Sequence, residues 1–112
     1  MPTKVLQINL KLKTSVLEYH SLCQSLAQTF AAIPGLCWKI WILNDRQKEA
    51  GGIYFFESEH ALNDFLSSPL AAQVKSHPAL FDFSAKVFDV MEEVTAITHG
   101  PVAAPATAAI NS

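Results

Sequence analysis

The sequence is poor in charge, and neither sign dominates. Charged side chains make up 16% of its 112 residues, hydrophobic ones make up 50%, and the formal net charge is −2. Phosphate binding needs a concentrated basic patch, whereas the eight lysines and arginines are scattered along the chain. The composition therefore argues for a globular protein and against nucleic acid as a principal partner.

Long apolar runs and closely spaced cysteines are also lacking. No window approaches the length of a membrane span, and strand-like residues begin at Lys4 without an apolar run of signal length. Cys23 and Cys37 form no C-x-x-C pair; their spacing allows a disulfide, but buried free thiols are the favoured interpretation. We therefore expect a cytoplasmic protein that does not bind a membrane.

Motifs for metals, phosphates and nucleophilic catalysis are absent. The four histidines form no pair at ligand spacing, and the lone pair His20-x-x-Cys23 is interpreted as incidental. Gly51-Gly52 lacks the spacing of a phosphate loop and favours a bulge or a close approach under the Trp41 ring. No Ser, His and acid set has the spacing of a triad. The sequence predicts no metal and no cofactor.

Hydrophobic periodicity and turn residues predict the order strand, helix, strand, strand, helix, strand. Ser15-x-x-Glu18 is a capping box, Pro34-Gly35 ends the first helix, and Ser58 and Ser68-Pro69 are further caps. The expected segments are residues 4–12, 15–33, 36–43, 50–56, 58–66, 68–77 and 81–90, and the second helix of the order comprises two of them, 58–66 and a short helix at 68–77. This order is typical of an α+β, ferredoxin-like split β-α-β fold (βαββαβ), with a four-stranded antiparallel sheet and helices on one face.

Residues 34–56 contain both tryptophans and predict a β-hairpin. Pairing of Leu43 with Ala50 would place Lys39 opposite Tyr54. One face would then be core, and the other would mix a cation, an indole and a phenol with apolar surface, as pockets and interfaces do. The expected core face holds Leu36, Trp38, Ile40, Ile42, Ile53 and Phe55, and the mixed face holds Cys37, Lys39, Trp41, Gly52, Tyr54 and Phe56.

We expect one domain over residues 1–99, followed by an Ala- and Pro-rich tail over residues 100–112. Residues 91–98 are expected to extend an edge strand or to reach across to a partner. The face of the sheet without helices carries too many aromatics for water, so a homodimer that pairs sheet to sheet is expected. That face is predicted to present Gln7, Asn9, Lys39, Trp41, Tyr54, Lys86 and Phe88.

Each candidate side chain has a structural and a functional interpretation. Lys39 either stays solvated or stands beside a bound oxyanion. Trp41 and Tyr54 either anchor the dimer interface or stack on a ligand. Asn9, with Gln7, either satisfies a partner backbone or orients a ligand hydroxyl. Trp38 favours the core, and Glu49 is either an exposed loop acid or a base at the rim of a pocket.

Three blocks of the sequence resemble the YdhR family of putative mono-oxygenases, small bacterial proteins of the dimeric α/β-barrel superfamily. The blocks are PGLCWKIW, EAGGIYFF and AKVFDV, at residues 34–41, 49–56 and 85–90. The resemblance implies a fold that dimerises through its sheets and a cofactor-independent oxidation of a small aromatic or quinol-like substrate by dioxygen. The resemblance implies that the family's functional block corresponds, position by position, to Trp38, Lys39, Trp41, Glu49, Gly51, Gly52 and Tyr54.

That chemistry would need a substrate anion that itself reduces dioxygen. Lys39 would hold the anion, Tyr54 or Asn9 would orient its hydroxyl, and Glu49 or a water would take the proton. The residues expected to be catalytic are Lys39, Trp41, Tyr54 and Asn9, and those expected to bind substrate are Trp38, Phe56, Phe88, Glu49 and Gly52. Two alternatives stay open, a non-catalytic dimer that binds a small molecule for sensing or carriage, and a dimer whose aromatics only build the interface.

Overall fold

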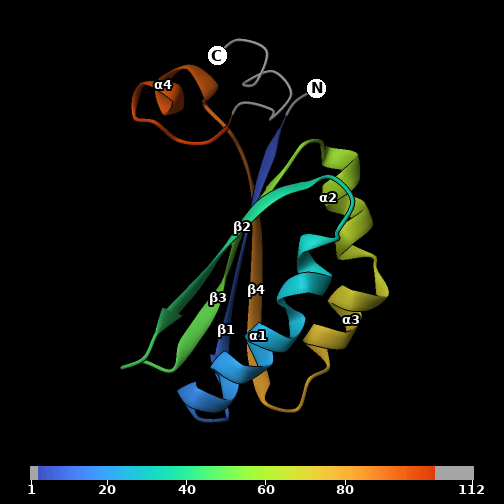
Figure 1. Ribbon diagram of the computed structural model, residues 1–112, viewed down its shortest axis with the longest axis vertical. Coiled ribbons are helices and arrows are strands. Elements are labelled where there is room, and N and C mark those ends of the chain that lie inside the picture. Colours follow the sequence, from blue (N-terminus) through green and yellow to red (C-terminus); the bar gives the residue numbers. More distant parts are fainter. Residues whose placement is uncertain (1–2, 103–112) are drawn as a thin grey trace.

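Four strands form one antiparallel sheet in the order β2-β3-β1-β4 (Figure 1). The computed structural model describes residues 3–102. The elements are β1 Lys4–Leu12, α1 Val16–Ala31, β2 Leu36–Asn44, β3 Glu49–Phe56, α2 Glu59–Leu66, α3 Pro69–Lys75, β4 Leu80–Asp89 and α4 Glu92–Ile97. The predicted ferredoxin-like α+β fold is confirmed. No helix among the described residues is long and apolar enough to cross a membrane.

Serine side chains begin the three helices that cover the sheet. Ser15 accepts a hydrogen bond from the Glu18 backbone N–H at 3.1 Å, and Ser58 and Ser68 accept equivalent bonds in α2 and α3. Each bond satisfies a backbone donor that the first helical turn leaves free. Beyond the end of α1, Gly35 has a φ of +80°, and a Cβ there would lie 2.4 Å from the Ala61 side chain. The predicted caps and the predicted stop are therefore confirmed.

The hairpin has the predicted register. Lys39 lies opposite Tyr54, and Leu43 lies opposite Ala50. The pairing shifts by one residue between Leu36 and Trp38, which leaves Cys37 as the extra residue of a bulge. The bulge keeps Leu36 opposite Phe56 while the rest of the strand alternates regularly.

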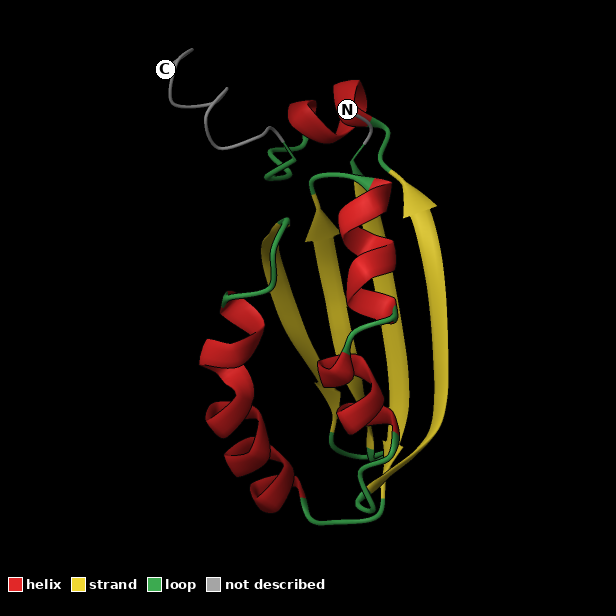
Figure 2. Cartoon of the chain, turned by 90° about the vertical axis from the view of Figure 1, so that its right-hand side faces the viewer, coloured by secondary structure: helices red, strands yellow, loops and turns green. Residues whose placement is uncertain are grey.

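The helices cover the opposite face of the hairpin from the one predicted. Tyr54 and Phe56 lie in the core with Leu6 of β1, and the Trp41 ring meets the Phe30 ring of α1 edge-on at 5.2 Å. Figure 2 shows the three helices α1, α2 and α3 on one side of the sheet. The expectation that Lys39, Trp41 and Tyr54 share the uncovered face with Gln7 and Asn9 is therefore wrong.

The register between β1 and β3 explains this correction. Leu6 pairs with Tyr54, and Gln7 pairs with Ile53, so the apolar side of β1 continues into the side of β3 that carries Tyr54. Both faces of the hairpin are apolar, and alternation within the hairpin alone cannot select the one that meets the helices. Only the pairing of β3 with β1 determines which face of the hairpin meets the helices.

The uncovered face of the sheet has its own aromatic layer. Trp38 stacks on Phe55, with 5.3 Å between ring centroids, and its indole N–H donates to the Pro101 carbonyl at 2.8 Å. Phe55 is fully buried by this arrangement, whereas Ile40 is 50% exposed and Phe88 is 47% exposed. The face is thus partly apolar and open to solvent in a single chain.

Residues after β4 form a helix and do not extend the edge strand as expected. α4 begins with Glu92 and Glu93, whose negative charges favour a helix N-terminus. The helix lies beyond the end of the sheet (Figure 1). Whether it reaches a partner stays a prediction, and most of the predicted tail, residues 103–112, lies outside the described residues.

Candidate active site

A cavity of about 450 Å³ lies between the sheet and the helices that cover it. That volume is within the range of small-molecule sites. The wall from α1 consists of Tyr19, Leu22, Cys23, Leu26 and Phe30, and the floor from the sheet includes Ile8, Leu10, Lys39, Trp41, Gly52, Tyr54 and Phe83. Residues from α2, α3 and the loop after them, including Phe65, Val74 and His77, complete the lining. The cavity is largely apolar, with few polar groups.

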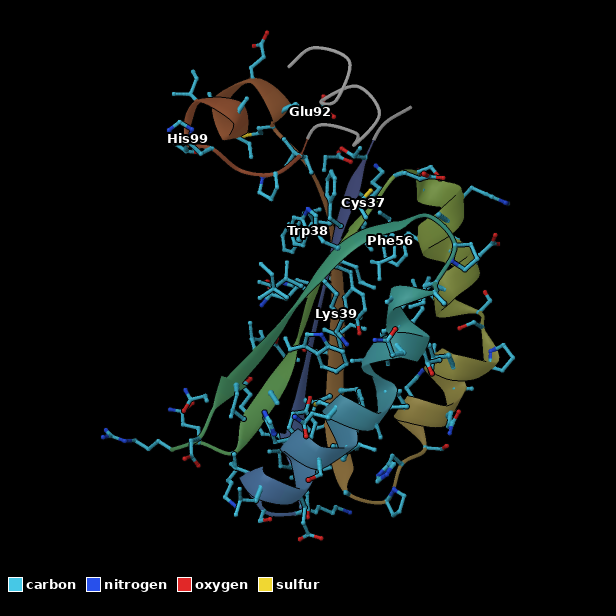
Figure 3. All side chains as sticks on the ribbon, viewed as in Figure 1. Cys37, Trp38, Lys39, Phe56, Glu92 and His99 are labelled. Atoms are coloured by element: carbon cyan, nitrogen blue, oxygen red, sulfur yellow. The ribbon has the colours of Figure 1, made fainter. Side chains whose placement is uncertain are left out.

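Lys39 places its amine among three aromatic rings. The Nζ atom lies 3.4 Å from the centroid of Trp41, 3.7 Å from that of Phe30 and 4.7 Å from that of Tyr54. The electron-rich faces of these rings attract a cation. In residues 3–102 no carboxylate forms an ion pair with this amine. Figure 3 shows Lys39 between the sheet and α1 and Trp38 on the other side of the strand.

Burial changes the acid-base behaviour of Lys39. Loss of hydration lowers the pKa of its amine to about 7, against a weak opposing effect of Cys23. Near neutral pH the amine is therefore present in both its neutral and its protonated form. The same group can accept a proton from a ligand and then serve as its counter-ion.

Gly52 leaves the space that the Lys39 stem occupies. A Cβ at Gly52 would lie 2.6 Å from Lys39 Cε and 3.1 Å from Tyr54 Cε1. The predicted close approach at the double glycine is confirmed, but it is made by the lysine stem and not by the Trp41 ring. The neighbouring Gly51 allows β1 to approach, because a Cβ there would lie 1.8 Å from the Ile8 carbonyl oxygen.

Two phenols and a thiol are the other groups of interest in the lining. Burial raises the pKa of Tyr54, and burial together with the neighbouring Cys23 raises the pKa of Tyr19. Burial also raises the pKa of the Cys23 thiol, although Tyr19 and Lys39 oppose the effect. All three groups therefore stay protonated near neutral pH and keep a hydrogen that they can donate. Both cysteines of the chain are free thiols.

The structure brings four predicted residues together and leaves the others outside the cavity. Lys39, Trp41, Gly52 and Tyr54 all line it. Phe56 lies on the same side of the sheet, but it is buried in the core beyond the cavity lining.

The remaining predicted residues lie elsewhere in the fold. Asn9 is on the uncovered face, where its side chain accepts a hydrogen bond from Gln7 at 3.3 Å. Glu49 is at the start of β3, and it does not line the cavity, so the structure offers no support for its role as a base. Trp38 and Phe88 are also on the uncovered side of the sheet.

Tyr19, Cys23, Phe30 and His77 line the cavity and are absent from the predicted site. The first three lie on the apolar stripe of α1. Tyr19 and Cys23 are the polar residues of that stripe, and their place on an otherwise apolar helix face was the sequence signal that could have found this part of the site. His77 follows α3, and its Nδ1 accepts a hydrogen bond from the Ala79 backbone N–H at 3.1 Å. That bond places the imidazole proton on Nε2 in the neutral ring.

Comparison with protein families gives one match. A family model described as "Putative mono-oxygenase ydhR" matches residues 5–101 of the chain. No curated protein matches the sequence.

Solved structures share the fold at low sequence identity. The cofactor-independent oxygenase SnoaB from Streptomyces nogalater superposes with a TM-score of 0.69 at 16% identity, over 84% of this chain and 98% of that chain. A protein of unknown function from Nitrosomonas europaea gives a TM-score of 0.67 at 16% identity, over 81% and 91% of the two chains. A dimeric ferredoxin-like protein of unknown function from Thermobifida fusca gives 0.62 at 17% identity, over 80% and 93%. These likenesses establish the fold, and function has to be argued from the cavity.

Proposed function

Because the chain belongs to the ydhR family of putative mono-oxygenases, we propose that it oxidises a small phenol or quinol-like aromatic with dioxygen and without a cofactor. The reaction takes place in the cavity between the sheet and α1 to α3. The observation that carries the proposal is the amine of Lys39, which lies inside a largely apolar cavity without an acidic partner among the described residues.

The first step is transfer of a proton from the substrate hydroxyl to the neutral amine of Lys39. The product is an ion pair of an aryloxide and an ammonium, which the low polarity of the cavity strengthens. A pKa of about 7 keeps much of the amine in the accepting form at neutral pH. Lys39 thus takes the role of base that was predicted for Glu49 or a water, in addition to its predicted role as counter-ion.

The aryloxide then supplies the electrons for dioxygen. One electron passes to dioxygen, the resulting superoxide and aryloxyl radical combine at a ring carbon that carries hydrogen, and a carbon–oxygen bond forms. The peroxide takes the proton held by Lys39. Loss of the ring hydrogen as a proton and cleavage of the oxygen–oxygen bond then yield a quinone and water. One phenol and one dioxygen give one quinone and one water, so no further reductant is needed.

The aromatic wall fixes the ring and keeps water away from the radical pair. Trp41 and Phe30 flank the Lys39 amine, so a substrate whose hydroxyl meets that amine has its ring beside theirs. The protonated phenols of Tyr54 and Tyr19 are available as donors to the substrate oxygen. Exclusion of water protects reactive intermediates from side reactions.

The proposal includes a homodimer that pairs through the uncovered face of the sheet. The exposed side chains of Ile40 and Phe88 support it, because apolar surface of this kind favours an interface. The relative from Thermobifida fusca is described as dimeric. A cytoplasmic location stays a prediction from the sequence.

Oxygen uptake tests the enzymatic function. With substituted hydroquinones and naphthols as substrates, we expect Lys39→Met to reduce kcat/KM for oxygen consumption by at least about a hundredfold, the range of a lost acid-base group. Lys13→Met is the matched control, since Lys13 also lies over an aromatic ring, Phe81, but outside the cavity.

Two outcomes would contradict the proposal. Equal oxygen uptake in the wild type and in Lys39→Met would exclude the assigned chemistry at this residue. Saturable binding of the aromatic compounds with no oxygen uptake in the wild type would favour the alternative, a dimer that binds a small molecule without turnover.

A further inference from the structure

Lys39 differs from the other described lysines in what surrounds its amine. Its Nζ lies within 4.7 Å of three ring centroids and inside the cavity. Lys4 is paired with Asp89, and Lys75, which also lines the cavity, is exposed. An amine held inside an apolar cavity without a carboxylate partner resembles the environment in which lysines become nucleophiles.

We propose that Lys39 captures a small aromatic aldehyde or ketone covalently, as a Schiff base, inside the cavity. The function goes beyond oxidation, because it requires neither dioxygen nor a phenolic substrate. It would make the cavity a site for carbonyl compounds that shares its binding surface with the proposed oxygenase site.

The chemistry balances within the groups present. The Nζ lone pair attacks the carbonyl carbon, a carbon–nitrogen bond forms, and the oxygen takes a proton to give a carbinolamine. The hydroxyl then leaves as water and the nitrogen loses its remaining proton, so one amine and one carbonyl give one imine and one water. The proton that leaves with the hydroxyl is replaced by the one that the nitrogen gives up, so the exchange needs no other acid or base.

The unprotonated amine is the reactive species, and burial supplies it. At pH 7 an amine with a pKa of about 7 is about half unprotonated. An exposed lysine with an ordinary pKa is unprotonated in fewer than about one molecule in a thousand. A reagent that enters the cavity therefore meets a nucleophile that the surface of the protein does not offer.

The lining selects the class of carbonyl compound. The walls beside the amine are the rings of Phe30 and Trp41, and Leu26 and Phe65 are further apolar members of the lining. A sugar would lose hydrogen bonds to water that these residues cannot replace. A small aromatic aldehyde has one polar atom to place and a ring that suits the apolar wall.

Reductive trapping tests the proposal. The full chain is treated at pH 7, without dioxygen, with benzaldehyde and sodium cyanoborohydride, and peptide mass spectrometry follows the benzylation of each lysine. We expect Lys39 to react at least about tenfold faster than the exposed Lys13, Lys75 and Lys86, because its amine lies inside the cavity and burial lowers its pKa to about 7. The peptide map separates this label from any at the α-amino group, whose ordinary pKa is also low.

Two results would overturn the proposal. One is benzylation of Lys39 at or below the rate of the exposed lysines in the wild-type protein. The other is a linear dependence of the Lys39 rate on benzaldehyde concentration, because capture inside a cavity requires prior binding and therefore saturation. Both measurements use the wild type, so they hold even if Lys39→Met does not fold. Since dioxygen is absent, failure here is separate from failure of the oxygenase reaction.

Discussion

At the scale of single residues, two features distinguish Lys39. It is a basic side chain without an acidic partner among the described residues, and its stem lies in space that exists only because Gly52 lacks a side chain. A buried lysine is usually unfavourable for folding because its charged form loses hydration. Retaining one in contact with Phe30, Trp41 and Tyr54 is therefore more consistent with use of the amine than with stability.

The pKa of Lys39 predicts how stability depends on pH. Its value in the folded chain, about 7, is below the ordinary 10.5, so between these values the unfolded chain binds more protons. The free energy of unfolding should therefore rise with pH, by at most about 1.4 kcal/mol per pH unit from this group. Urea unfolding of the wild type and of Lys39→Met, from pH 7 to pH 9, measures the difference. The raised pKa values of Tyr19 and Tyr54 act at higher pH.

A stability difference that stays constant between pH 7 and pH 9 would contradict a lowered pKa of Lys39. The Lys13→Met variant serves as the control. Lys13 is exposed, so its removal should leave the pH dependence of the free energy of unfolding unchanged in this range.

Substitution of Gly52 tests the space beneath the lysine. We predict that Gly52→Ala lowers the free energy of unfolding by about 1–3 kcal/mol, because the added methyl would overlap Lys39 Cε and crowd the Tyr54 ring. The same substitution in a Lys39→Ala background should cost less, since the overlapping stem is gone. Chemical unfolding measures both losses of free energy. Equal losses in the two backgrounds would show that the Lys39 stem does not need the space left by Gly52.

At the scale of secondary-structure elements, the serine caps determine where the covering helices begin. Ser58 is 8% exposed, and its hydroxyl accepts a hydrogen bond from the Ala61 backbone N–H at 3.1 Å. We predict that Ser58→Ala lowers the free energy of unfolding by about 1 kcal/mol, since a buried donor loses its partner. Ser67→Ala, at the exposed end of the same helix, is the control and should change it by less than about 0.5 kcal/mol. A reversed order of the two effects in thermal or urea unfolding would refute the assigned cap.

The elements were largely predictable from the sequence, because local chemistry determines them. The serine caps, the proline after Ser68 and the alternation of residues 4–12 each act within a few residues, and each element appears where these signals place it. The hairpin register was also predictable, since the loop length and the apolar runs allow Leu43 to pair with Ala50.

The candidate site was predictable only in part, because it depends on contacts between distant elements. Lys39 and Tyr54 were found as cross-strand neighbours. The choice of face required the pairing of Leu6 with Tyr54, which no local pattern encodes. Tyr19 and Cys23 resembled ordinary members of an apolar helix face until α1 was placed over the lysine. The helix after β4 was missed because short segments respond to their surroundings more than to their own propensity.

At the scale of the whole molecule, the two faces of the sheet differ, and we propose separate tasks for them. The covered face holds the cavity within one chain, whereas the uncovered face carries exposed apolar side chains such as Ile40 and Phe88. Trp38 and Phe55 stack on each other on the uncovered face. A sheet that is apolar on both sides favours a second cover, which the proposed homodimer would supply through two-fold symmetry.

This division predicts that subunit pairing and ligand binding can be separated. Ile40→Asp places a charge on the uncovered face, where Ile40 is 50% exposed, and should shift a dimer to monomers in analytical ultracentrifugation. Leu17→Asp is the matched control, because Leu17 is 81% exposed on α1 and lies outside the proposed interface. The Ile40→Asp monomer should still bind aromatic compounds with a Kd within about threefold of the wild type, since residues of one chain line the cavity. If sedimentation is unchanged by Ile40→Asp but altered by Leu17→Asp, the contact lies on the helical side and the uncovered face needs another explanation.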